Sequence, residues 1–255
     1  MFLEERHQKI LEILNTQGKI VVRDLSALFG VSEGMIRKDL QVLEQQNKLK
    51  RTYGGAIIRR EMPHDEVLRE RLDKNRTAKN IIAGLVAKQI PVGCSVFLDS
   101  SSTNLLVAQE LIQSQQFNRI ITNMPQLITL FPAESPCELF LLGGRFDKRL
   151  GGVVGLEAVN TLKKHQIDIA VLGVAGIDLV RGIVTNFDSE EGLTKHAVIE
   201  SSRQTIITLE KEKFYHDGGF SFATLKEVDL LVCDKELTTA ELKQLESHAV
   251  NVITP

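Results

Sequence analysis

Apolar residues recur at the three- and four-residue spacing of amphipathic helices in the first part of the chain. These stretches cover residues 4–15, 23–29 and 32–46. Gly18 and Gly30 follow the first two, and glycine commonly ends helices because it accepts a positive φ. Ser32 is a good N-cap for the third helix. We therefore predict three short helices, with a brief β-branched strand over residues 20–22.

Residues 49–58 follow a different pattern, in which two short segments of extended character flank Gly54 and Gly55. This pattern is typical of a β-hairpin. Three helices followed by a hairpin predict a winged helix-turn-helix domain over residues 1–58. Residues 59–76 are dense in charge, poor in large apolar side chains and contain Pro63, which predicts a linker leading into the next helix.

From residue 77 onward, short continuous apolar segments alternate with helical ones. We expect strands at 95–98, 120–121, 139–142, 169–174, 205–209, 230–233 and 250–253. Apolar strands that alternate with helices are typical of a parallel sheet covered on both faces. The pattern predicts an α/β domain over residues 77–255, which is long enough to bury its own core.

Charge is distributed unevenly, although the whole chain carries a formal net charge of only −2. Residues 1–60 hold 11 Lys and Arg against 7 Asp and Glu, and the remainder holds 20 against 26. A basic head on an acidic body favours a polyanion-binding module joined to a second domain. No apolar run approaches the roughly 20 residues of a membrane helix, and the first residues lack the apolar core of a signal peptide. We therefore expect a cytoplasmic protein with no membrane partner.

The cysteines are Cys94, Cys137 and Cys233, which lie far apart in the sequence. Because they form no CxxC pair, they indicate neither a zinc site nor a disulfide framework. We expect reduced, buried thiols, no metal and no cofactor.

The third predicted helix offers side chains for contacts with double-stranded DNA. A recognition helix places its N-terminal residues in the major groove. We expect Arg37 near the base edges and Lys38 nearer the phosphates, while Gly34 allows a close approach. The alternative is a solvated face on an ordinary bundle, but the Gly30 turn, the Ser32 cap and the basic hairpin favour DNA binding. The expected DNA contacts are Ser32, Gly34, Met35, Arg37, Lys38, Gln41, Arg51, Thr52 and Tyr53.

Polar residues follow the expected strands of the second domain. In open α/β sheets, ligands bind at the carboxyl ends of the strands. A hydroxyl-rich loop that opens a helix suits a phosphate, because the first N–H groups of the helix are free. These strand ends favour a small, hydroxyl-rich, anionic ligand such as a sugar phosphate. The residues expected to bind it are Asp99, Ser100, Ser101, Ser102, Thr103, Thr122, Asn123, Gly143, Gly144, Asp178 and Lys213.

An ordered series of residues in the first domain also carries a family resemblance. The series is Val31-Ser32, Ile36-Arg37-Lys38-Asp39-Leu40, Leu43-Glu44 and Arg51-Thr52-Tyr53-Gly54-Gly55-Ala56. It closely resembles the DNA-binding domain of DeoR-family transcriptional regulators. The chain departs from the family pattern at Met35, Asn47 and Tyr53, where the family usually has Thr, Gly and His.

The resemblance extends through the second domain. It is carried by Asp99 to Thr103, Thr122-Asn123, Gly143-Gly144, Gly176-Ile177-Asp178 and Glu212-Lys213-Phe214. It implies an effector domain similar to ribose-5-phosphate isomerase and CoA-transferase-type folds, which binds a phosphorylated sugar. Ser101 stands where the family often has Gly, and Glu210 and Glu212 stand where it tends to have Asp and Ser. Acids at these two positions either weaken a phosphate contact at Lys213 or draw Lys213 into an ion pair with Glu.

Together these features predict a non-enzymatic repressor of a sugar-metabolism operon, switched by a sugar phosphate. A homodimer or homotetramer is expected, because two heads must span half-sites about one helical turn apart. The alternative is an isomerase-like enzyme with a DNA-binding appendage, in which Asp99, Asp178, Glu190 or Glu191 supplies a base and Lys213 binds the anion. A third reading is an architectural DNA-binding protein with an inert body.

Overall fold

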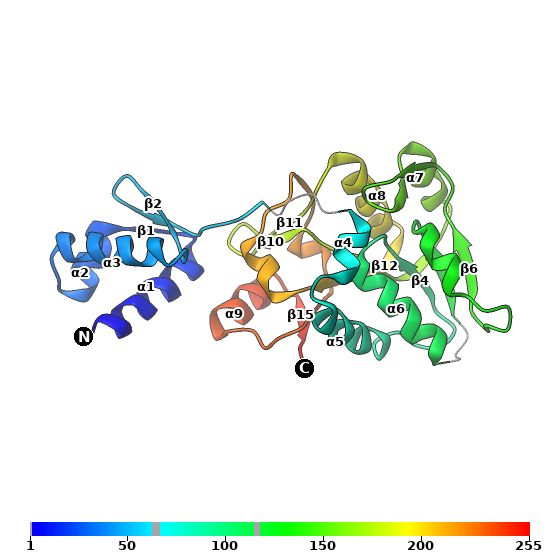
Figure 1. Cartoon of the computed structure of the whole chain (residues 1–255), viewed down its shortest axis with the longest axis horizontal. Helices are drawn as coiled ribbons and strands as arrows, with labels where there is room; N and C mark the ends of the chain where they lie inside the picture. The colour runs from blue at the N-terminus through cyan, green and yellow to red at the C-terminus, as the bar shows by residue number, and fades with distance from the viewer. Residues whose placement is uncertain (1, 63–66, 115–117) are drawn as a thin grey trace.

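A small N-terminal head and a larger α/β body are joined by an extended segment in the computed structural model of the chain (Figure 1). The structure describes residues 2–62, 67–114 and 118–255. Pro63, part of the predicted linker, lies outside the described residues. None of the helices in the described ranges is both long and apolar enough to cross a membrane.

The head has the predicted winged helix-turn-helix architecture. Its core consists of apolar residues from all three helices, with Ile10, Leu14, Ile36 and Leu40 almost fully buried. The middle strand of its three-stranded sheet is β3, which pairs antiparallel with both β1 and β2. The elements are α1 (Leu3–Gln17), β1 (Lys19–Val21), α2 (Val22–Phe29), α3 (Glu33–Gln45), β2 (Lys50–Thr52) and β3 (Gly55–Ile57).

The turns of the head follow the chemistry that the sequence indicates. Gly18 and Gly30 end α1 and α2 in the left-handed conformation, and the Ser32 side chain accepts a hydrogen bond from the Met35 N–H. Asn47 also has a positive φ, of 59°. This explains why the resembled family usually has Gly there, and Asn is one of the few other residues that tolerate this conformation.

The body is built on a seven-stranded parallel sheet in the order β15-β14-β12-β9-β4-β5-β6. Each of the seven strands overlaps a strand predicted from an apolar run, although β9 and β12 begin two and three residues earlier than predicted. Their bounds are β4 (Ser95–Leu98), β5 (Arg119–Thr122), β6 (Glu138–Leu141), β9 (Ile167–Gly173), β12 (Ser202–Leu209), β14 (Leu230–Cys233) and β15 (Asn251–Ile253).

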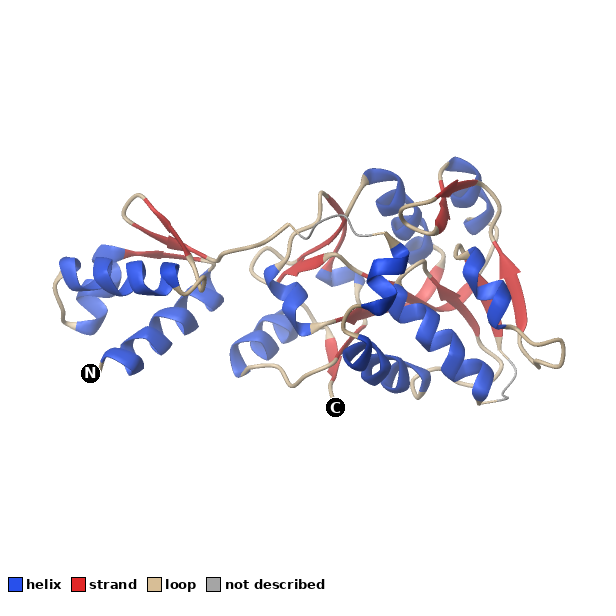
Figure 2. Ribbon diagram, in the orientation of Figure 1, coloured by secondary structure: helices blue, strands red, loops and turns tan. Residues whose placement is uncertain are grey.

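Helices cover both faces of this sheet (Figure 2). Successive strand residues point to opposite faces, so Val96 and Leu98 of β4 pack with α5 (Arg76–Ala87) and α6 (Ser102–Gln113). Phe97 lies in the core on the other face. That face is covered by α7 (Leu156–Leu162), α8 (Ser189–Glu200) and α9 (Thr239–Ser247).

Several short elements were not predicted from the sequence. The segment expected to be a linker holds α4 (Leu68–Asp73), whose Leu68 is buried against the body core. Two small antiparallel sheets also form, and strands of three to five residues are too short to give a clear alternating pattern. They comprise β7 (Arg145–Asp147) and β8 (Gly152–Val154), and β10 (Gly176–Asp178), β11 (Ile183–Asn186) and β13 (Phe220–Thr224). The 3₁₀ turns η2 (Lys211–Tyr215) and η3 (Leu225–Glu227) were also not predicted, whereas η1 (Pro125–Leu130) lies where the apolar pattern predicts a short helix over residues 126–130.

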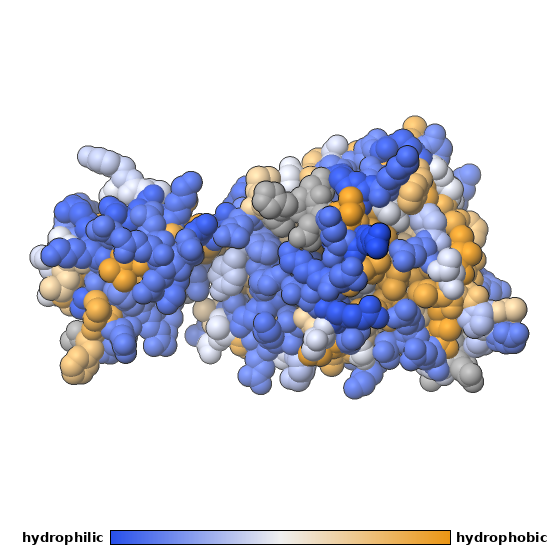
Figure 3. All heavy atoms as spheres, in the orientation of Figure 1, coloured by the Kyte–Doolittle hydropathy of each residue, from blue (hydrophilic) through white to orange (hydrophobic). Residues whose placement is uncertain are grey.

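Surface hydropathy differs between the two parts. The head is largely hydrophilic in the view of Figure 3, whereas apolar residues gather on the body around the edge strand β6. Phe140 of β6, Phe146 of β7 and Ile128 of η1 are exposed. All three cysteines are free thiols, and Cys137 and Cys233 are buried.

Candidate DNA-binding surface and ligand pocket

The start of α3 and the β2–β3 hairpin form the candidate DNA-binding surface. Arg37 projects from the first turns of α3, and its side chain is 56% exposed. Its Nη2 donates to Glu33 Oε2 at 2.5 Å, a surface ion pair that a DNA phosphate or guanine can replace. All nine residues predicted to contact DNA are exposed: Ser32, Gly34, Met35, Arg37, Lys38, Gln41, Arg51, Thr52 and Tyr53.

A buried ion pair fixes the orientation of α3 against α1. Arg6 donates to Asp39 through Nε at 2.6 Å and through Nη2 at 3.0 Å, and His7 Nε2 lies 3.2 Å from the same carboxylate. Asp39 therefore faces inward while its neighbours Arg37 and Lys38 face solvent. The sequence pattern gives no sign of this pair, because Arg6 and Asp39 are 33 residues apart in the chain.

The hairpin, or wing, is held to the rest of the head at its glycine turn. A Cβ on Gly55 would lie 2.0 Å from the carbonyl oxygen of Ile20 in β1, so only glycine fits there. The Gly54 carbonyl accepts a hydrogen bond from the Val22 N–H at 2.8 Å. At the other end of the wing, Glu44 of α3 accepts from the Arg51 N–H at 2.9 Å. These contacts place the exposed Arg51, Thr52 and Tyr53 beside the recognition helix.

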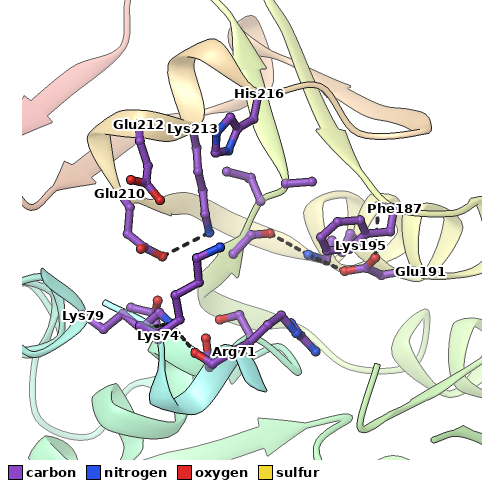
Figure 4. Close-up of a pocket in the computed structure, with 16 residues that line it drawn as sticks. Arg71, Lys74, Lys79, Phe187, Glu191, Lys195, Glu210, Glu212, Lys213 and His216 are labelled. Carbon is purple, nitrogen blue, oxygen red and sulfur yellow. Dashed lines mark hydrogen bonds and ion pairs between the residues drawn. The ribbon is translucent and has the colours of Figure 1, made fainter. Parts of the chain in front are cut away.

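A charged pocket lies at the carboxyl ends of β4, β9 and β12 in the body (Figure 4). It is enclosed by α4 and the start of α5, the first turn of α6, the middle of α8, and η2. Of the described residues that line it, five are Lys or Arg and three are Glu. The lining residues are Arg71, Lys74, Lys79, Ser101, Ser102, Thr103, Gly173, Val174, Ala175, Phe187, Glu191, Lys195, Glu210, Glu212, Lys213 and His216.

Lys195 occupies the floor of this pocket and is paired with two carboxylates. Its Nζ lies 3.1 Å from Asp99 Oδ2 and 2.9 Å from Glu191 Oε1, and it donates to the Gly173 carbonyl at 2.5 Å. Burial disfavours the ammonium form, but the charges of Asp99 and Glu191 outweigh burial and raise the pKa of Lys195. Burial likewise opposes the charged form of Glu191, but the Lys195 charge prevails and lowers its pKa.

Asp99 organises the strand ends under the pocket. One of its oxygens accepts from the Ser101 N–H at 2.9 Å and from Asn104 Nδ2 at 2.7 Å, and the other accepts from the Gly173 N–H at 2.9 Å. The carboxylate thus joins β4, the start of α6 and the end of β9. Ser101 caps α6. Its side chain packs closely on Gly173, because a Cβ added to Gly173 would lie 2.4 Å from the Ser101 Cβ.

Lysines converge on the open side of the pocket. The amino groups of Lys74 and Lys213 point toward one another across it (Figure 4). Lys213 Nζ lies 3.4 Å from Glu210 Oε1, so one of the two acids that flank Lys213 in the sequence does form an ion pair with it. Lys79 Nζ donates to the Lys74 carbonyl at 2.5 Å and to the Arg71 carbonyl, which fixes the corner between α4 and α5.

Two further groups set the charge of the pocket. Burial opposes ionisation of Glu210, but the Lys213 charge and a hydrogen bond from Asn75 together lower its pKa, so it is a carboxylate near neutral pH. Burial lowers the pKa of His216, which favours the neutral imidazole. The pocket therefore combines lysine cations and carboxylates with a neutral imidazole at His216.

The structure brings together only part of the predicted ligand-binding set. Ser101, Ser102, Thr103 and Lys213 line the pocket, and Asp99 lies directly behind Lys195. Lys74, Glu191, Lys195 and His216 also line it, although they were not among the predicted ligand contacts. Glu191 and Lys195 are four residues apart in α8. This spacing, at which opposite charges attract on a helix, is the sequence feature that could have indicated their ion pair.

The remaining predicted residues lie outside this pocket. Thr122 donates to the Leu98 carbonyl at 2.7 Å and Asn123 to the Val153 carbonyl at 2.9 Å, so both hold neighbouring strands. Ser100 packs on Gly152, and Gly144 lies beside Val153. Asp178 ends β10 in a small separate sheet, where it lines a second cleft against the head and accepts from the N–H groups of Val180 and Arg181. Gly143 follows β6 and is exposed.

A winged helix-turn-helix head whose α3 exposes Arg37 and Lys38, joined to an α/β domain with a charged pocket, defines a DNA-binding regulator. Residues 6–61 match the DeoR-like helix-turn-helix domain, and residues 74–235 match the DeoR C terminal sensor domain. The chain belongs to the DeoR family of transcriptional regulators and is therefore a regulator rather than an enzyme.

Relatives of the chain carry the names of repressors. The glycerol-3-phosphate regulon repressor of Escherichia coli (strain K12) is 30% identical over 251 residues, which cover 97% of each chain. The HTH-type transcriptional repressor GlcR of Bacillus subtilis (strain 168) is 31% identical over 253 residues, 99% of this chain and 96% of the relative. Among solved structures, ribose 5-phosphate isomerase A of Methanocaldococcus jannaschii matches 55% of each chain with 15% identity and a TM-score of 0.39.

Proposed function

We propose that this protein is a repressor of genes for the use of a sugar or polyol, and that a small phosphorylated sugar or polyol in the charged pocket lowers its affinity for operator DNA. The observation that carries the proposal is the convergence of Lys74 and Lys213 on the pocket that the first turn of α6 also lines. The name of the relative from Escherichia coli, a glycerol-3-phosphate regulon repressor, supports the same ligand class.

The chemistry of the pocket favours a phosphate over an uncharged sugar. Ser102 and Thr103 lie in the first turn of α6, where backbone N–H groups have no acceptor within the helix. These N–H groups and the positive end of the helix dipole stabilise an anion. A phosphate there also gains charge-assisted hydrogen bonds from lysine, while the Ser and Thr hydroxyls suit the hydroxyls of a sugar or polyol.

The carboxylates that the enzyme alternative would need are engaged elsewhere. Asp99 and Glu191 both pair with Lys195, and Asp99 accepts three further hydrogen bonds. Asp178 faces the second cleft, and Glu190 pairs with Arg145 outside the pocket. Of these four, only Glu191 lines the charged pocket, and the Lys195 charge that lowers its pKa makes it a weaker base, so this arrangement supports binding without turnover.

We further propose that the protein acts in the cytoplasm as a homodimer or homotetramer on double-stranded operator DNA. One head offers a single short recognition helix, and paired heads can contact half-sites on successive turns of the duplex. The exposed Phe140 and Phe146 on the body support self-association away from the head. Sedimentation analysis of the full chain tests the oligomeric state, and a monomer at micromolar concentration contradicts it.

The ligand is tested by thermal unfolding against glycerol 3-phosphate, glucose 6-phosphate and fructose 1-phosphate, each with its unphosphorylated counterpart. A ligand that binds only the folded state raises the melting temperature, so at least one phosphate ester should raise it and its counterpart should not. Lys213→Ala should abolish the shift. Lys226→Ala, a change at an exposed lysine in η3, should preserve it.

The regulatory step is tested by DNA binding. A duplex selected in vitro on the wild-type chain should bind more weakly in the presence of the phosphate ester that stabilises the protein. Steady turnover of any of these esters favours the enzyme alternative. Stabilisation by none of them, together with unchanged DNA affinity, contradicts the proposed function and favours an inert body.

A further inference from the structure

One segment of the body faces the pocket and the head at the same time. Residues 210–217, here called the coupling segment, comprise η2 and its flanking residues. Glu210, Glu212, Lys213 and His216 of this segment line the charged pocket (Figure 4). Its main chain on the other side is bound by residues 60 and 61, which follow the wing.

Arg60 makes the central contact with the coupling segment. Its guanidinium donates to Asp217 Oδ1 at 2.6 Å, to the Phe214 carbonyl at 2.9 Å and to the His216 carbonyl at 2.5 Å. Nη2 also donates to the Ile177 carbonyl of β10 at 3.0 Å. The Arg60 side chain is only 15% exposed, so these hydrogen bonds are largely shielded from water.

Backbone pairing reinforces this contact. The Glu61 N–H donates to the Tyr215 carbonyl at 2.9 Å, and the Asp217 N–H donates to the Glu61 carbonyl at 2.8 Å. Residue 61 therefore pairs with the coupling segment as a short parallel bridge. Arg60 lies three residues beyond β3, and the Ile58 N–H is bonded to the Gly18 carbonyl, so the connection to the wing is short and held at both ends.

The coupling segment packs closely against its neighbours on both sides. A Cβ on Gly176 of β10 would lie 2.0 Å from the His216 carbonyl oxygen, so the two backbones are in direct contact. On the pocket side, Asn75 donates to Glu210 at 2.7 Å and to Glu212 at 2.9 Å. A ligand that displaces Lys213 from Glu210 or engages His216 acts on residues directly adjacent to the carbonyls that Arg60 binds.

From these contacts we infer that Arg60 and the coupling segment transmit occupancy of the pocket to the DNA-binding head. The inference rests on the proposed function, since it names the route by which that pocket acts on DNA. A ligand changes DNA affinity only if it prefers one of two arrangements of the chain. Here the arrangements differ in whether the coupling segment presents its carbonyls and Asp217 to Arg60.

A second contact between head and body provides a matched control. Gln244 of α9 donates to the carbonyls of Thr16 at 3.1 Å and Asn15 at 3.3 Å at the end of α1. This contact joins the same two domains but involves no residue that lines the charged pocket. Gln244→Ala therefore tests whether loosening the contact between head and body is by itself enough to abolish the effect of a ligand on DNA affinity.

The test compares wild type, Arg60→Met and Gln244→Ala in the full chain. Methionine keeps much of the length of the arginine side chain and removes its donors. With the duplex selected on wild type and saturating glycerol 3-phosphate or glucose 6-phosphate, wild-type DNA affinity should fall by about five-fold or more, and that of Arg60→Met by less than about two-fold. Gln244→Ala should respond as wild type does. A wild-type response in folded Arg60→Met overturns the inference while leaving the proposed function intact.

A second measurement does not need a sugar phosphate. Because coupling is reciprocal, DNA binding should alter hydrogen exchange of residues 210–217 by about two-fold or more in wild type. Arg60→Met should lose this change, and Gln244→Ala should keep it. If no phosphate ester affects wild type, the proposed function fails, and the exchange result alone decides the inference. The inference is overturned if DNA binding leaves the hydrogen exchange of residues 210–217 unchanged in wild type.

Discussion

Asp99 Oδ2 and Lys195 Nζ lie 3.1 Å apart beneath the charged pocket, and both side chains are almost completely buried. The lysine extends from α8 across the end of β9 to reach a carboxylate that follows β4. Glu191 completes the cluster from one turn earlier in α8. This group joins two strands and two helices, so the shape of the pocket depends on its charges.

Replacing Lys195 should destabilise the body strongly. Lys195→Met leaves Asp99 and Glu191 buried without their shared cation, and breaking a buried ion pair in this way costs about 3–5 kcal/mol. Urea unfolding of the full chain near neutral pH measures the loss. The control is Lys235→Met, at a lysine whose side chain is 72% exposed, which should change stability by less than about 0.5 kcal/mol. Equal stability of the two variants contradicts a structural role for the cluster.

Loss of Lys195 should also reverse the pH dependence contributed by Glu191. In wild type the pKa of Glu191 lies below its ordinary value of 4.5, so its stabilisation is present above that pH and is lost as the pH falls through the folded-state pKa. Without the Lys195 charge, burial raises the pKa of Glu191. Lys195→Met should therefore regain stability relative to wild type between about pH 7 and about pH 4. The expectation is contradicted if the free energies of unfolding of wild type and Lys195→Met differ by the same amount at every pH in this range.

Arg37 and Lys38 should affect DNA binding in different ways. Arg37→Ala is expected to cost about 1–3 kcal/mol on the selected duplex and to relax base preference at one position. Lys38→Ala should weaken binding to all sequences alike and reduce the salt slope by about one. Titrations of the selected duplex and of single-base variants at several salt concentrations separate the two. Unchanged affinity and selectivity in Arg37→Ala removes it from the set of DNA contacts.

Gly55 and Gly34 should respond oppositely to alanine. Gly55→Ala places a Cβ 2.0 Å from the Ile20 carbonyl, which should separate β3 from β1, destabilise the head and abolish DNA binding. A Cβ on Gly34 in α3 would lie at an ordinary contact distance of 3.9 Å from Ser32 Oγ, so Gly34→Ala should raise head stability by up to about 1 kcal/mol. Thermal unfolding measures both effects. A weaker DNA affinity in the stabilised Gly34→Ala would place the start of α3 against the duplex.

The sequence predicted helices whose apolar residues repeat over more than one turn and strands whose apolar residues cover both faces. Runs such as Ile206-Ile207 belong to strands buried on both faces, and residues such as Ile36 and Leu40 repeat at helical spacing. The α4 helix was missed because most of its residues are charged and one buried residue, Leu68, is too few to give a helical apolar pattern. Asn47 was noted as a departure, but the positive φ that explains it becomes visible only in the folded turn.

The residues of the charged pocket were predicted less completely than the fold. Strand ends correctly pointed to Ser101, Ser102 and Thr103 as residues at the edge of the sheet. Asp178 was grouped with them because it also follows an apolar strand, but β10 leaves the main sheet and carries it to the head. Lys195 was missed because a charged residue in a helix is usually solvent-facing. Its burial becomes favourable only with two carboxylate partners, and one of them, Asp99, is distant in the sequence.

Three of the four groups that receive hydrogen bonds from Arg60 are main-chain carbonyls, at residues 177, 214 and 216. Every amino acid supplies such an acceptor. Side chains that face the pocket, such as those of Lys213 and His216, can therefore be exchanged without removing what Arg60 holds. Under the proposed coupling, substitutions in the pocket can change which molecule binds and leave the contacts of Arg60 intact, so ligand specificity and transmission to the head can evolve separately.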